Sequence, residues 1–314
     1  DNTFKLLEVL IDKYSNFHLL KRSRSAGGGK SGALNYALNH VKGDWLFILD
    51  ADAQFQSDVL LRIVDSINRF GWQAVQLRKA VTNSKKNLLT SFQAMEMAMD
   101  AVIQRGRLMI GGVVELRGNG QFIHRKILDK CGGFNEGTVT DDLDMSFRLL
   151  ISGAMVGILW DPPVEEEAVE NLPQLFKQRQ RWAEGGLQRF FDYWNSLFFR
   201  NLDFIKKRDL ACFFLLQYAI PLVSLADLLT SLLTRTIPVY WPLSFVALTV
   251  SGLAYWRGCR QNSEGPALPY PNMLRLFCAI TYLLHWFIVI PWVTLKMAIF
   301  PKKIVWVKTI HKGV

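Results

Sequence analysis

The stretch WLFILDAD, at residues 45–52, is the part of the sequence that decides the fold. It opens with five consecutive apolar residues after the polar pair Gly43-Asp44, and a run of this length is typical of a strand buried in a parallel sheet. It closes on two carboxylates, Asp50 and Asp52. Because ligands of open α/β sheets bind beyond the carboxyl ends of the strands, the two acids stand where a functional site is expected.

Asp50 and Asp52 are candidate ligands of a divalent cation. Two carboxylates one residue apart reach the same side of a turn. Such hard oxygen ligands suit Mg²⁺ or Mn²⁺, with positions left open for phosphate oxygens. The structural alternative is an ordinary acidic turn on the surface, which a pair of this spacing does not exclude by itself.

Helices and short strands alternate around the strand at residues 45–49. The hydrophobic pattern predicts helices at residues 6–11, 33–39, 58–70, 88–106 and 143–151, and further strands at residues 17–21 and 74–79. This alternation indicates an α/β domain with a mostly parallel sheet covered by helices on both faces. We assign residues 1–186 to this domain.

Apolar residues are concentrated in the carboxyl-terminal third. Half of the chain is hydrophobic, which is high for a protein with 20% charged residues. Three apolar stretches of roughly spanning length lie at residues 211–233, 236–256 and 276–295. The first is the weakest because it contains Pro221 and Asp227. We therefore expect residues 209–300 to form a small transmembrane region with a re-entrant or interfacial first segment and two true spans.

Two further segments indicate a membrane surface. Residues 187–208 place apolar and aromatic side chains at helical spacing and end in three consecutive basic residues, the pattern of an amphipathic helix in the membrane interface. A helix packed on the protein core is the alternative. Residues 301–314 form a basic tail that we expect on the cytoplasmic side, and its charged residues are Lys302, Lys303, Lys308 and Lys312.

The formal net charge of +10 at pH 7 is compatible with several kinds of partner. Many of the Lys and Arg residues flank the apolar stretches, which favours anionic lipid headgroups over nucleic acid. The four cysteines have no CxxC spacing, so neither a zinc site nor a disulfide framework is expected. No signal peptide precedes the soluble part, and we expect an integral membrane protein whose active site faces the cytoplasm.

A second acidic cluster, TDDLD at residues 140–144, precedes the helix predicted at residues 143–151. Acids in the first turn of a helix are a common capping arrangement, and this is the structural interpretation. The functional interpretation is a general base, held near the metal, that accepts a proton from an attacking hydroxyl.

The pentapeptide QRQRW, at residues 178–182, is the third polar feature. Arg181 next to Trp182 combines a bidentate ligand for oxyanions with a flat surface on which a sugar or base can stack. An exposed helix surface is the alternative. The glycine-rich segment at residues 26–31 does not fit the phosphate loop of nucleotide triphosphatases because Arg24 stands where that motif needs glycine, but Lys30 remains a candidate ligand of a donor phosphate.

The order of these features is more specific than any one of them. A GKSGALN segment, an acid pair at a strand end, a TDD segment before a helix and QxxRW before apolar stretches occur in that order. This order resembles the family 2 glycosyltransferases, in the membrane-embedded branch that includes cellulose, chitin and hyaluronan synthases. The resemblance extends over residues 17–185 and continues into the apolar part.

A narrower resemblance rests on five segments. They are ELRGNGQF at residues 115–122, CGGFNEGTVTDDLD at 131–144, VEEEAV at 164–169, QRQRWAEGG at 178–186 and WVKTIHKG at 306–313. These segments are similar to those of the β-monoglucosyldiacylglycerol synthases, which move glucose from UDP-glucose to diacylglycerol.

The resemblance implies a GT-A-like fold, an inverting reaction and a role for each matching residue. It implies that Asp50 and Asp52 hold Mg²⁺ or Mn²⁺, and that Asp142 is the catalytic base with Asp141 in the place of the family's glutamate. It assigns the UDP-sugar donor to Lys30, Gln178, Arg181 and Trp182, together with the two metal ligands. The diacylglycerol acceptor would contact Arg117, Asn119, Gln121 and Trp182.

Two other functions fit the same motifs. A processive β-glycan synthase would share all of them, but three or fewer spans leave little material for a channel. A catalytically inactive membrane protein is the second alternative. Family members begin with two strands that have no counterpart here, since the chain opens on Asp1-Asn2-Thr3, so we expect a fragment that lacks those strands and is inactive alone.

Overall fold

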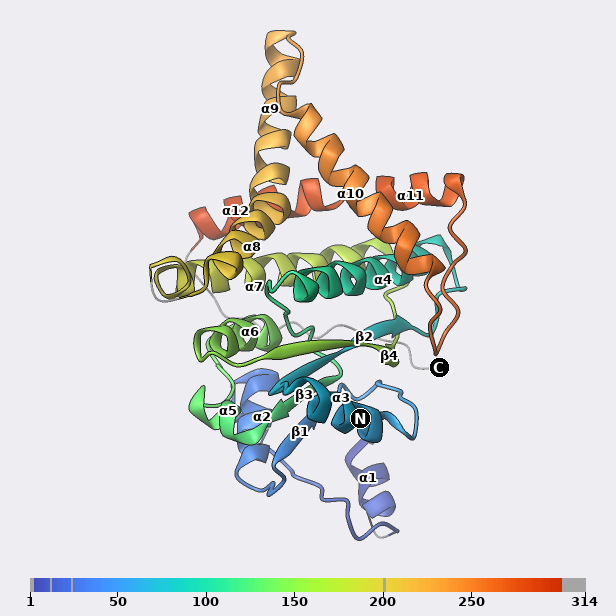
Figure 1. Cartoon of the computed structure of the whole chain (residues 1–314), viewed down its shortest axis with the longest axis vertical. Helices are drawn as coiled ribbons and strands as arrows, with labels where there is room; N and C mark the ends of the chain where they lie inside the picture. Colours follow the sequence, from blue (N-terminus) through green and yellow to red (C-terminus); the bar gives the residue numbers. More distant parts are fainter. Residues whose placement is uncertain (1–2, 12, 24, 200–201, 301–314) are drawn as a thin grey trace.

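The computed structural model describes residues 3–11, 13–23, 25–199 and 202–300, which form stacked layers (Figure 1). A mixed sheet lies in the lower half, helices α4 (Leu88–Met109) and α7 (Leu172–Phe198) lie above it, and a helical hairpin projects from the top. The tail at residues 301–314, with the expectation of a cytoplasmic position for it, lies outside the described residues.

The sheet has four strands in the order β1-β3-β2-β4. Its strands are β1 (Trp45–Ile48), β2 (Ala74–Val81), β3 (Gln121–His124) and β4 (Val156–Glu166). Strands β2 and β4 are parallel, whereas β3 runs antiparallel to both of its neighbours. The α/β class is confirmed, and the sheet is mixed: β1, β2 and β4 run in one direction, and β3 inserts between β1 and β2 in the opposite direction.

The strands predicted at residues 45–49 and 74–79 are present, and the one predicted at residues 17–21 is an irregular segment outside the sheet. Strands β3 and β4 were not predicted, although β4 begins with the apolar run VGILW at residues 156–160. β3 is only four residues long, and β4 carries two prolines and two glutamates among its eleven residues. Both strands are therefore defined by their pairing with β2 rather than by periodicity.

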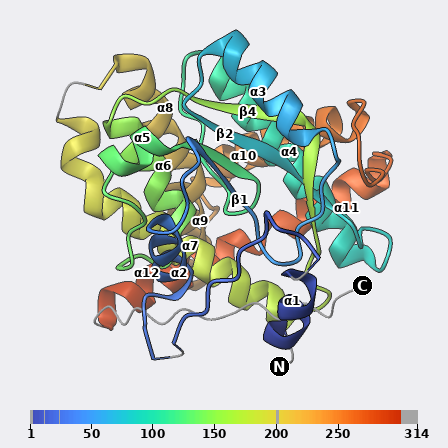
Figure 2. The ribbon, with the colours of Figure 1, turned by 90° about the horizontal axis from the view of Figure 1, so that it is seen from below.

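Helices cover both faces of the sheet, as Figure 2 shows from below. On one face Ile63 of α3 (Val59–Phe70) packs with Leu77 and Val164. On the other face Ala98 of α4 packs with Ile158 of β4. The remaining helices of this half are α1 (Thr3–Ile11), α2 (Gly29–Leu38), α5 (Arg125–Lys130) and α6 (Asp141–Ile151).

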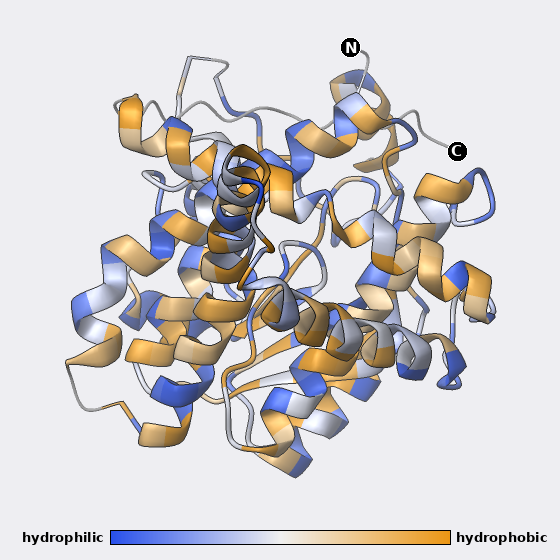
Figure 3. Cartoon of the chain, turned by 90° about the horizontal axis from the view of Figure 1, so that it is seen from above, coloured by the Kyte–Doolittle hydropathy of each residue, from blue (hydrophilic) through white to orange (hydrophobic). Residues whose placement is uncertain are grey.

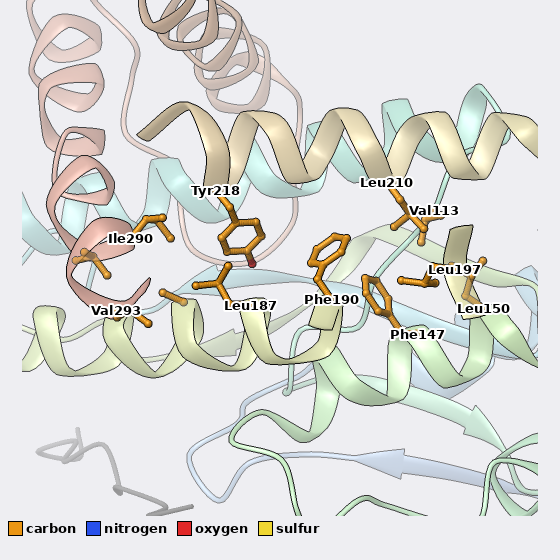
Figure 4. Close-up of a cluster of buried hydrophobic side chains, with 12 residues drawn as sticks. Val113, Phe147, Leu150, Leu187, Phe190, Leu197, Leu210, Tyr218, Ile290 and Val293 are labelled. Carbon is orange, nitrogen blue, oxygen red and sulfur yellow. The ribbon is translucent and has the colours of Figure 1, made fainter. Parts of the chain in front are cut away.

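Helix α7 is longer than the sequence indicated. The amphipathic helix predicted at residues 187–208 is divided: its first part is the second half of this 27-residue helix, which ends at Phe198, and its last part is the start of α8 (Phe204–Phe214). Its residues Leu187 and Phe190 are buried in a core cluster with Phe147 of α6 (Figure 4). Phe191 and Trp194 of the same helix are exposed. Part of the apolar side of α7 thus packs on the protein core, and the remainder is exposed.

The carboxyl-terminal region consists of helices alone among the described residues. They are α8 (Phe204–Phe214), the π-helical turn η1 (Leu215–Ala219), α9 (Ile220–Thr234), α10 (Trp241–Arg260), α11 (Met273–Leu283) and α12 (Trp286–Ile299). Two continuous stretches, Phe204–Thr234 and Met273–Ile299, are long and apolar enough to cross a membrane. The first of these includes the segment that the sequence marked as the weakest.

Candidate active site

Asp50 lies just beyond β1, between two other segments of the molecule. β1 ends at Ile48, and the Asp50 carboxylate accepts a 2.6 Å hydrogen bond from the ammonium of Lys30 in the first turn of α2. The Asp50 amide donates to the side-chain oxygen of Asn119, 3.1 Å away, in the segment before β3. The strand before this acid is not the buried parallel strand that the sequence predicted, because β1 lies at the edge of the sheet and is fully buried only at Ile48. Asp50 is joined to the glycine-rich segment and to the loop before β3.

The first turn of α6 contains Asp141, Asp142 and Asp144. Asp144 has a structural role, because its carboxylate accepts bonds of 2.7 Å from Arg148 and 2.9 Å from the hydroxyl of Tyr193. The side chains of Asp141 and Asp142 remain as the chemically interesting pair at this helix N-terminus. The partners of Asp144 are side chains, and the N-cap residue Thr140 makes no side-chain capping hydrogen bond, so these contacts do not support the capping interpretation.

Gly118 allows Asp142 to approach the loop before β3. This glycine has a φ of +85°, which other residues rarely adopt. A β-carbon added there would stand 3.3 Å from a carboxylate oxygen of Asp142. The carbonyl of Gly118 accepts a hydrogen bond of 3.2 Å from Lys30. Asp142, Lys30 and Asp50 are therefore neighbours around one glycine.

Lys30 is the electrostatic centre of the group. Burial alone would lower its pKa, but the carboxylates of Asp141, Asp50 and Asp142 outweigh that effect and raise it. Burial raises the pKa of Asp141 to about 6, and the neighbouring carboxylates of Asp142 and Asp50 act in the same direction against the attraction of Lys30. One ammonium thus faces three carboxylates from two parts of the chain.

Trp182 lies against two cations. The guanidinium of Arg179 is 4.0 Å from the centre of its ring, and the ammonium of Lys79 is 5.6 Å away. Gln178 accepts a 2.9 Å hydrogen bond from Arg179. The QxxRW motif is therefore held on one side of α7 by Arg179, a residue that the motif leaves unspecified.

A chain of contacts connects Trp182 with Asp50. Lys79, near the end of β2, forms a 2.6 Å ion pair with Glu166 at the end of β4. Glu166 accepts a weak bond of 3.4 Å from Asn119, whose oxygen receives the Asp50 amide. Lys79 and Glu166 were not predicted as site residues; the run of three glutamates at residues 165–167 was their only signal.

The residues expected to contact the acceptor lie in less open positions. Arg117 forms ion pairs of 2.8 Å with both Asp100 and Glu115. Asn119 and Gln121 are fully buried, and the side-chain amide of Gln121 has no hydrogen-bond partner among the described residues. Asn119 belongs to the site through Asp50, whereas contact of the acceptor with Arg117 and Gln121 stays a prediction.

The acid pair fits an open metal site rather than an enclosed one. The Asp50 side chain is 41% exposed, so a cation can reach it. Within the part of the chain that the structure describes, no group of three or more His, Cys, Asp or Glu side chains is arranged to hold a metal ion. Mg²⁺ and Mn²⁺ commonly take one or two carboxylates and complete their shell with water and substrate phosphates, and Asp50 and Asp52 offer that donor set.

The known proteins that this chain is similar to are enzymes that transfer sugars. Residues 45–300 match the family model described as glycosyl transferase family group 2. The chain is 42% identical to the β-monoglucosyldiacylglycerol synthase of Synechocystis over 99% of its own length and 66% of that protein. It is 40% identical to the synthase of the same name from Nostoc over 100% of its length and 68% of that protein. The chain thus spans about two thirds of these curated relatives.

The fold has a counterpart among solved structures. The mannosyltransferase PcManGT from Pyrobaculum calidifontis, in complex with GDP-Man and Mn²⁺, aligns with a TM-score of 0.60. The alignment covers 96% of this chain and 76% of that protein at 18% identity. A likeness at this identity supports the GT-A-like arrangement of the elements and leaves the chemistry to be argued from the residues.

Proposed function

Because the chain belongs to glycosyl transferase family group 2, as its motif order indicated, we propose that it transfers one glucose from UDP-glucose to diacylglycerol with inversion at the anomeric carbon. The named activity of the Synechocystis and Nostoc relatives supports this donor and this acceptor. The product is a β-linked monoglucosyl lipid.

The observation that carries the proposal is the position of Lys30. Its ammonium pairs with Asp50 at 2.6 Å and is attracted by Asp141 and Asp142 as well. The candidate metal ligand Asp50, the candidate phosphate ligand Lys30 and the candidate catalytic acids thus come from three segments that are far apart in the sequence. Such convergence is typical of an active site.

The residues divide into a donor end and an acceptor end. Lys30, Gln178 and Arg181 bind the diphosphate, and Trp182 offers its ring to the sugar. A divalent cation held by Asp50 and Asp52 would supply positive charge to the leaving diphosphate. Arg181 and Lys30 add to that stabilisation, which acts where negative charge develops during bond breaking.

Asp142 acts as the general base. Its carboxylate accepts the proton of the diacylglycerol hydroxyl while that oxygen forms a bond to the anomeric carbon of glucose. The bond from this carbon to the diphosphate oxygen breaks, and UDP leaves with the electron pair. Because the oxygen attacks from the face opposite to UDP, one displacement inverts the configuration. Asp141, with its pKa raised to about 6 by burial, maintains the negative field beside the base.

Localisation follows from the acceptor. Diacylglycerol resides in the membrane, and the exposed apolar side chains of α7, including Phe191 and Trp194, lie on the helix that carries the QxxRW motif. We place the catalytic half on the cytoplasmic face, where UDP-glucose is available.

The test is product analysis with membranes that contain the full protein. Labelled UDP-glucose and diacylglycerol should yield one glycolipid by thin-layer chromatography, with a single β-linked hexose by mass spectrometry and NMR. Asp65→Asn, at an exposed position of α3, is a matched control that should leave the yield unchanged. A ladder of long glycans would instead support a processive synthase, and failure to consume UDP-glucose would refute the proposed activity.

A further inference from the structure

The loop between α10 and α11 is fixed on the catalytic half of the molecule. The guanidinium of Arg62, on α3, donates hydrogen bonds of 2.7 and 2.9 Å to the Glu264 carboxylate. Arg78 donates to the Glu264 carbonyl at 2.9 Å, and the indole of Trp160 donates to the Asn262 carbonyl at 2.9 Å. Helix α10 therefore ends on the side of the sheet.

The start of the hairpin is fixed on the same side. Asp209, in α8, accepts a 2.8 Å hydrogen bond from the amide of Val113 and forms a 2.9 Å ion pair with Arg107 of α4. Helix α9 and the first half of α10 project away from the remainder of the protein (Figure 1), whereas the end of α10 packs on α4, with Tyr255 buried in one cluster with Met95. Both ends of the hairpin thus belong to the catalytic side.

Helices α11 and α12 lie along α4 and α7 instead of leaving them. The Tyr282 hydroxyl and the Trp286 indole donate to Glu96 of α4 at 2.8 and 3.2 Å. Further along, Ile290 and Val293 are buried in the cluster that contains Leu187 of α7 (Figure 4). Contacts at both α11 and α12 hold the stretch Met273–Ile299 against the catalytic half, so it has no free length with which to cross a bilayer.

The opposite side of α11 and α12 is apolar and open. Its exposed side chains include Leu274, Phe277, Ile288, Trp292 and Leu295. A helix that packs on protein with one side and exposes aliphatic and aromatic residues on the other is suited to lie at the boundary of headgroups and acyl chains.

The residues of the projecting hairpin are suited to a lipid environment, and Figure 3 shows the hydropathy of this side of the molecule. Near its tip, Leu233 and Ile237 are each 86% exposed. Its polar groups are satisfied within the hairpin: Asp227 accepts from the amide of Tyr240 at 2.9 Å, and the hydroxyls of Ser224 and Ser244 bond to each other at 2.5 Å. Internal satisfaction of polar groups is what a hydrocarbon environment requires.

We propose that α9 and α10 cross the bilayer as a hairpin, while α11 and α12 lie flat in the headgroup layer on the catalytic side. The 15 residues of α9 rise about 22 Å and the 20 residues of α10 rise about 30 Å, although the last turns of α10 lie beside α4. A hairpin shorter than a hydrocarbon core of about 30 Å is accommodated by local thinning of the bilayer. Arg235, Tyr240 and Trp241 at the tip are residue types that favour the opposite headgroup layer.

Basic residues near the catalytic end of the hairpin are suited to contact anionic lipid headgroups. They are Lys206, Lys207, Arg208, Arg257 and Arg260. This arrangement replaces the topology expected from hydropathy alone. Residues 211–233 contribute a crossing helix instead of a re-entrant one, residues 276–295 do not cross, and the loop at residues 261–272 stays on the catalytic side.

The test uses single-cysteine variants of the full protein in which Cys131, Cys212, Cys259 and Cys278 are replaced by serine. Cells containing Arg235→Cys, Asn262→Cys or Phe300→Cys are treated with a membrane-impermeant maleimide before and after permeabilisation. We expect the cysteine at position 235 on one side of the membrane and those at positions 262 and 300 together on the other. Position 235 sharing a side with either of them overturns the proposal, whichever way the catalytic half faces.

A second measurement does not depend on side assignment. Val250→Cys, in the middle of α10, and Phe277→Cys, on the exposed side of α11, are labelled with bimane in vesicles of phosphatidylcholine and phosphatidylglycerol. The probe at position 250 should be quenched more by a lipid brominated deep in its acyl chain, and the probe at position 277 more by a lipid labelled near the headgroup. Equal depth for the two probes would contradict the flat position of α11.

Discussion

The segment from Glu115 to Asn119 belongs to two charged clusters, and the pKa of a buried acid is shifted in opposite directions in the two. Burial would raise the pKa of Glu115, but three guanidinium groups hold it well below its usual range. These belong to Arg189, Arg107 and Arg117, at 3.2, 3.8 and 2.8 Å. Asp141 is buried as well, yet it faces a single ammonium together with other carboxylates, and its pKa rises to about 6.

This difference in charge balance distinguishes a cluster that stabilises the fold from one that is suited to catalysis. The Glu115 cluster has enough positive charge for its acid and links the loop to α4 and α7, so it holds the fold together. The Asp141 cluster has more negative than positive charge, and it attracts a cation or a proton. Only Gly118 separates Arg117 of the first cluster from Asn119 of the second.

Removal of the proposed base should have the largest effect on activity, and it tests the catalytic role of the cluster around Asp141. Asp142→Asn should lower the rate of sugar transfer by about 10²–10⁴-fold, because the amide cannot accept a proton. Initial rates at saturating UDP-glucose measure this, and calorimetry should find UDP binding unchanged. The exposed substitution Asp65→Asn is the control. Retention of most of the activity would remove Asp142 from the role of base.

Glu115→Gln tests the structural side. The substitution keeps the shape of the side chain but leaves the guanidinium group of Arg189 without its buried counter-charge, which should cost about 3–5 kcal/mol of stability. Denaturant or thermal unfolding of the purified protein measures the loss. The same measurement on Asp142→Asn should show little change. Equal stability of the two variants would abolish the distinction between the clusters.

Asp52→Ala sharpens the assignment of the metal. Loss of one of two carboxylate ligands should weaken the Mg²⁺-dependent part of UDP binding by at least about tenfold, a change that the loss of outer-shell partners alone can produce. Calorimetry with and without Mg²⁺ separates this part from the contribution of Lys30 and Arg181. An unchanged metal requirement would exclude Asp52 as a ligand.

Asp141→Asn should give the smallest effect, and its sign is opposite to that of Glu115→Gln. The folded protein keeps a proton on Asp141 up to about pH 6, whereas the unfolded chain releases it near 3.8. The folded state therefore loses stability as pH rises through this window. The uncharged amide avoids that loss, so the variant should be more stable by roughly 3 kcal/mol above pH 7.

The comparison of unfolding at two pH values completes this test. At pH 4 the difference between Asp141→Asn and the unmodified protein should nearly vanish, since Asp141 is protonated there in the folded state. A variant that is less stable at pH 7.5, or a difference independent of pH, would show that the acid is balanced as Glu115 is.

Local sequence pattern was sufficient for the parts that depend on short-range physics. The apolar run at residues 45–49 forms β1, the amphipathic segment at residues 58–70 forms α3, and the acids at residues 141–144 open α6. Each depends on side-chain periodicity or on caps within a few residues. The order of motifs also identified the family, because it preserves chemistry without reference to geometry.

Only the tertiary structure decided which of these pieces meet. The reversed direction of β3, the buried pairing of Glu115 with Arg189 and the contact of Lys79 with Glu166 join residues whose partners lie far along the chain. The apolar stretch Met273–Ile299 is the clearest case. Its apolar composition favours burial away from water, but it does not decide between lipid and protein as the surroundings. The contacts of Tyr282 and Trp286 with Glu96 show that one side packs on protein.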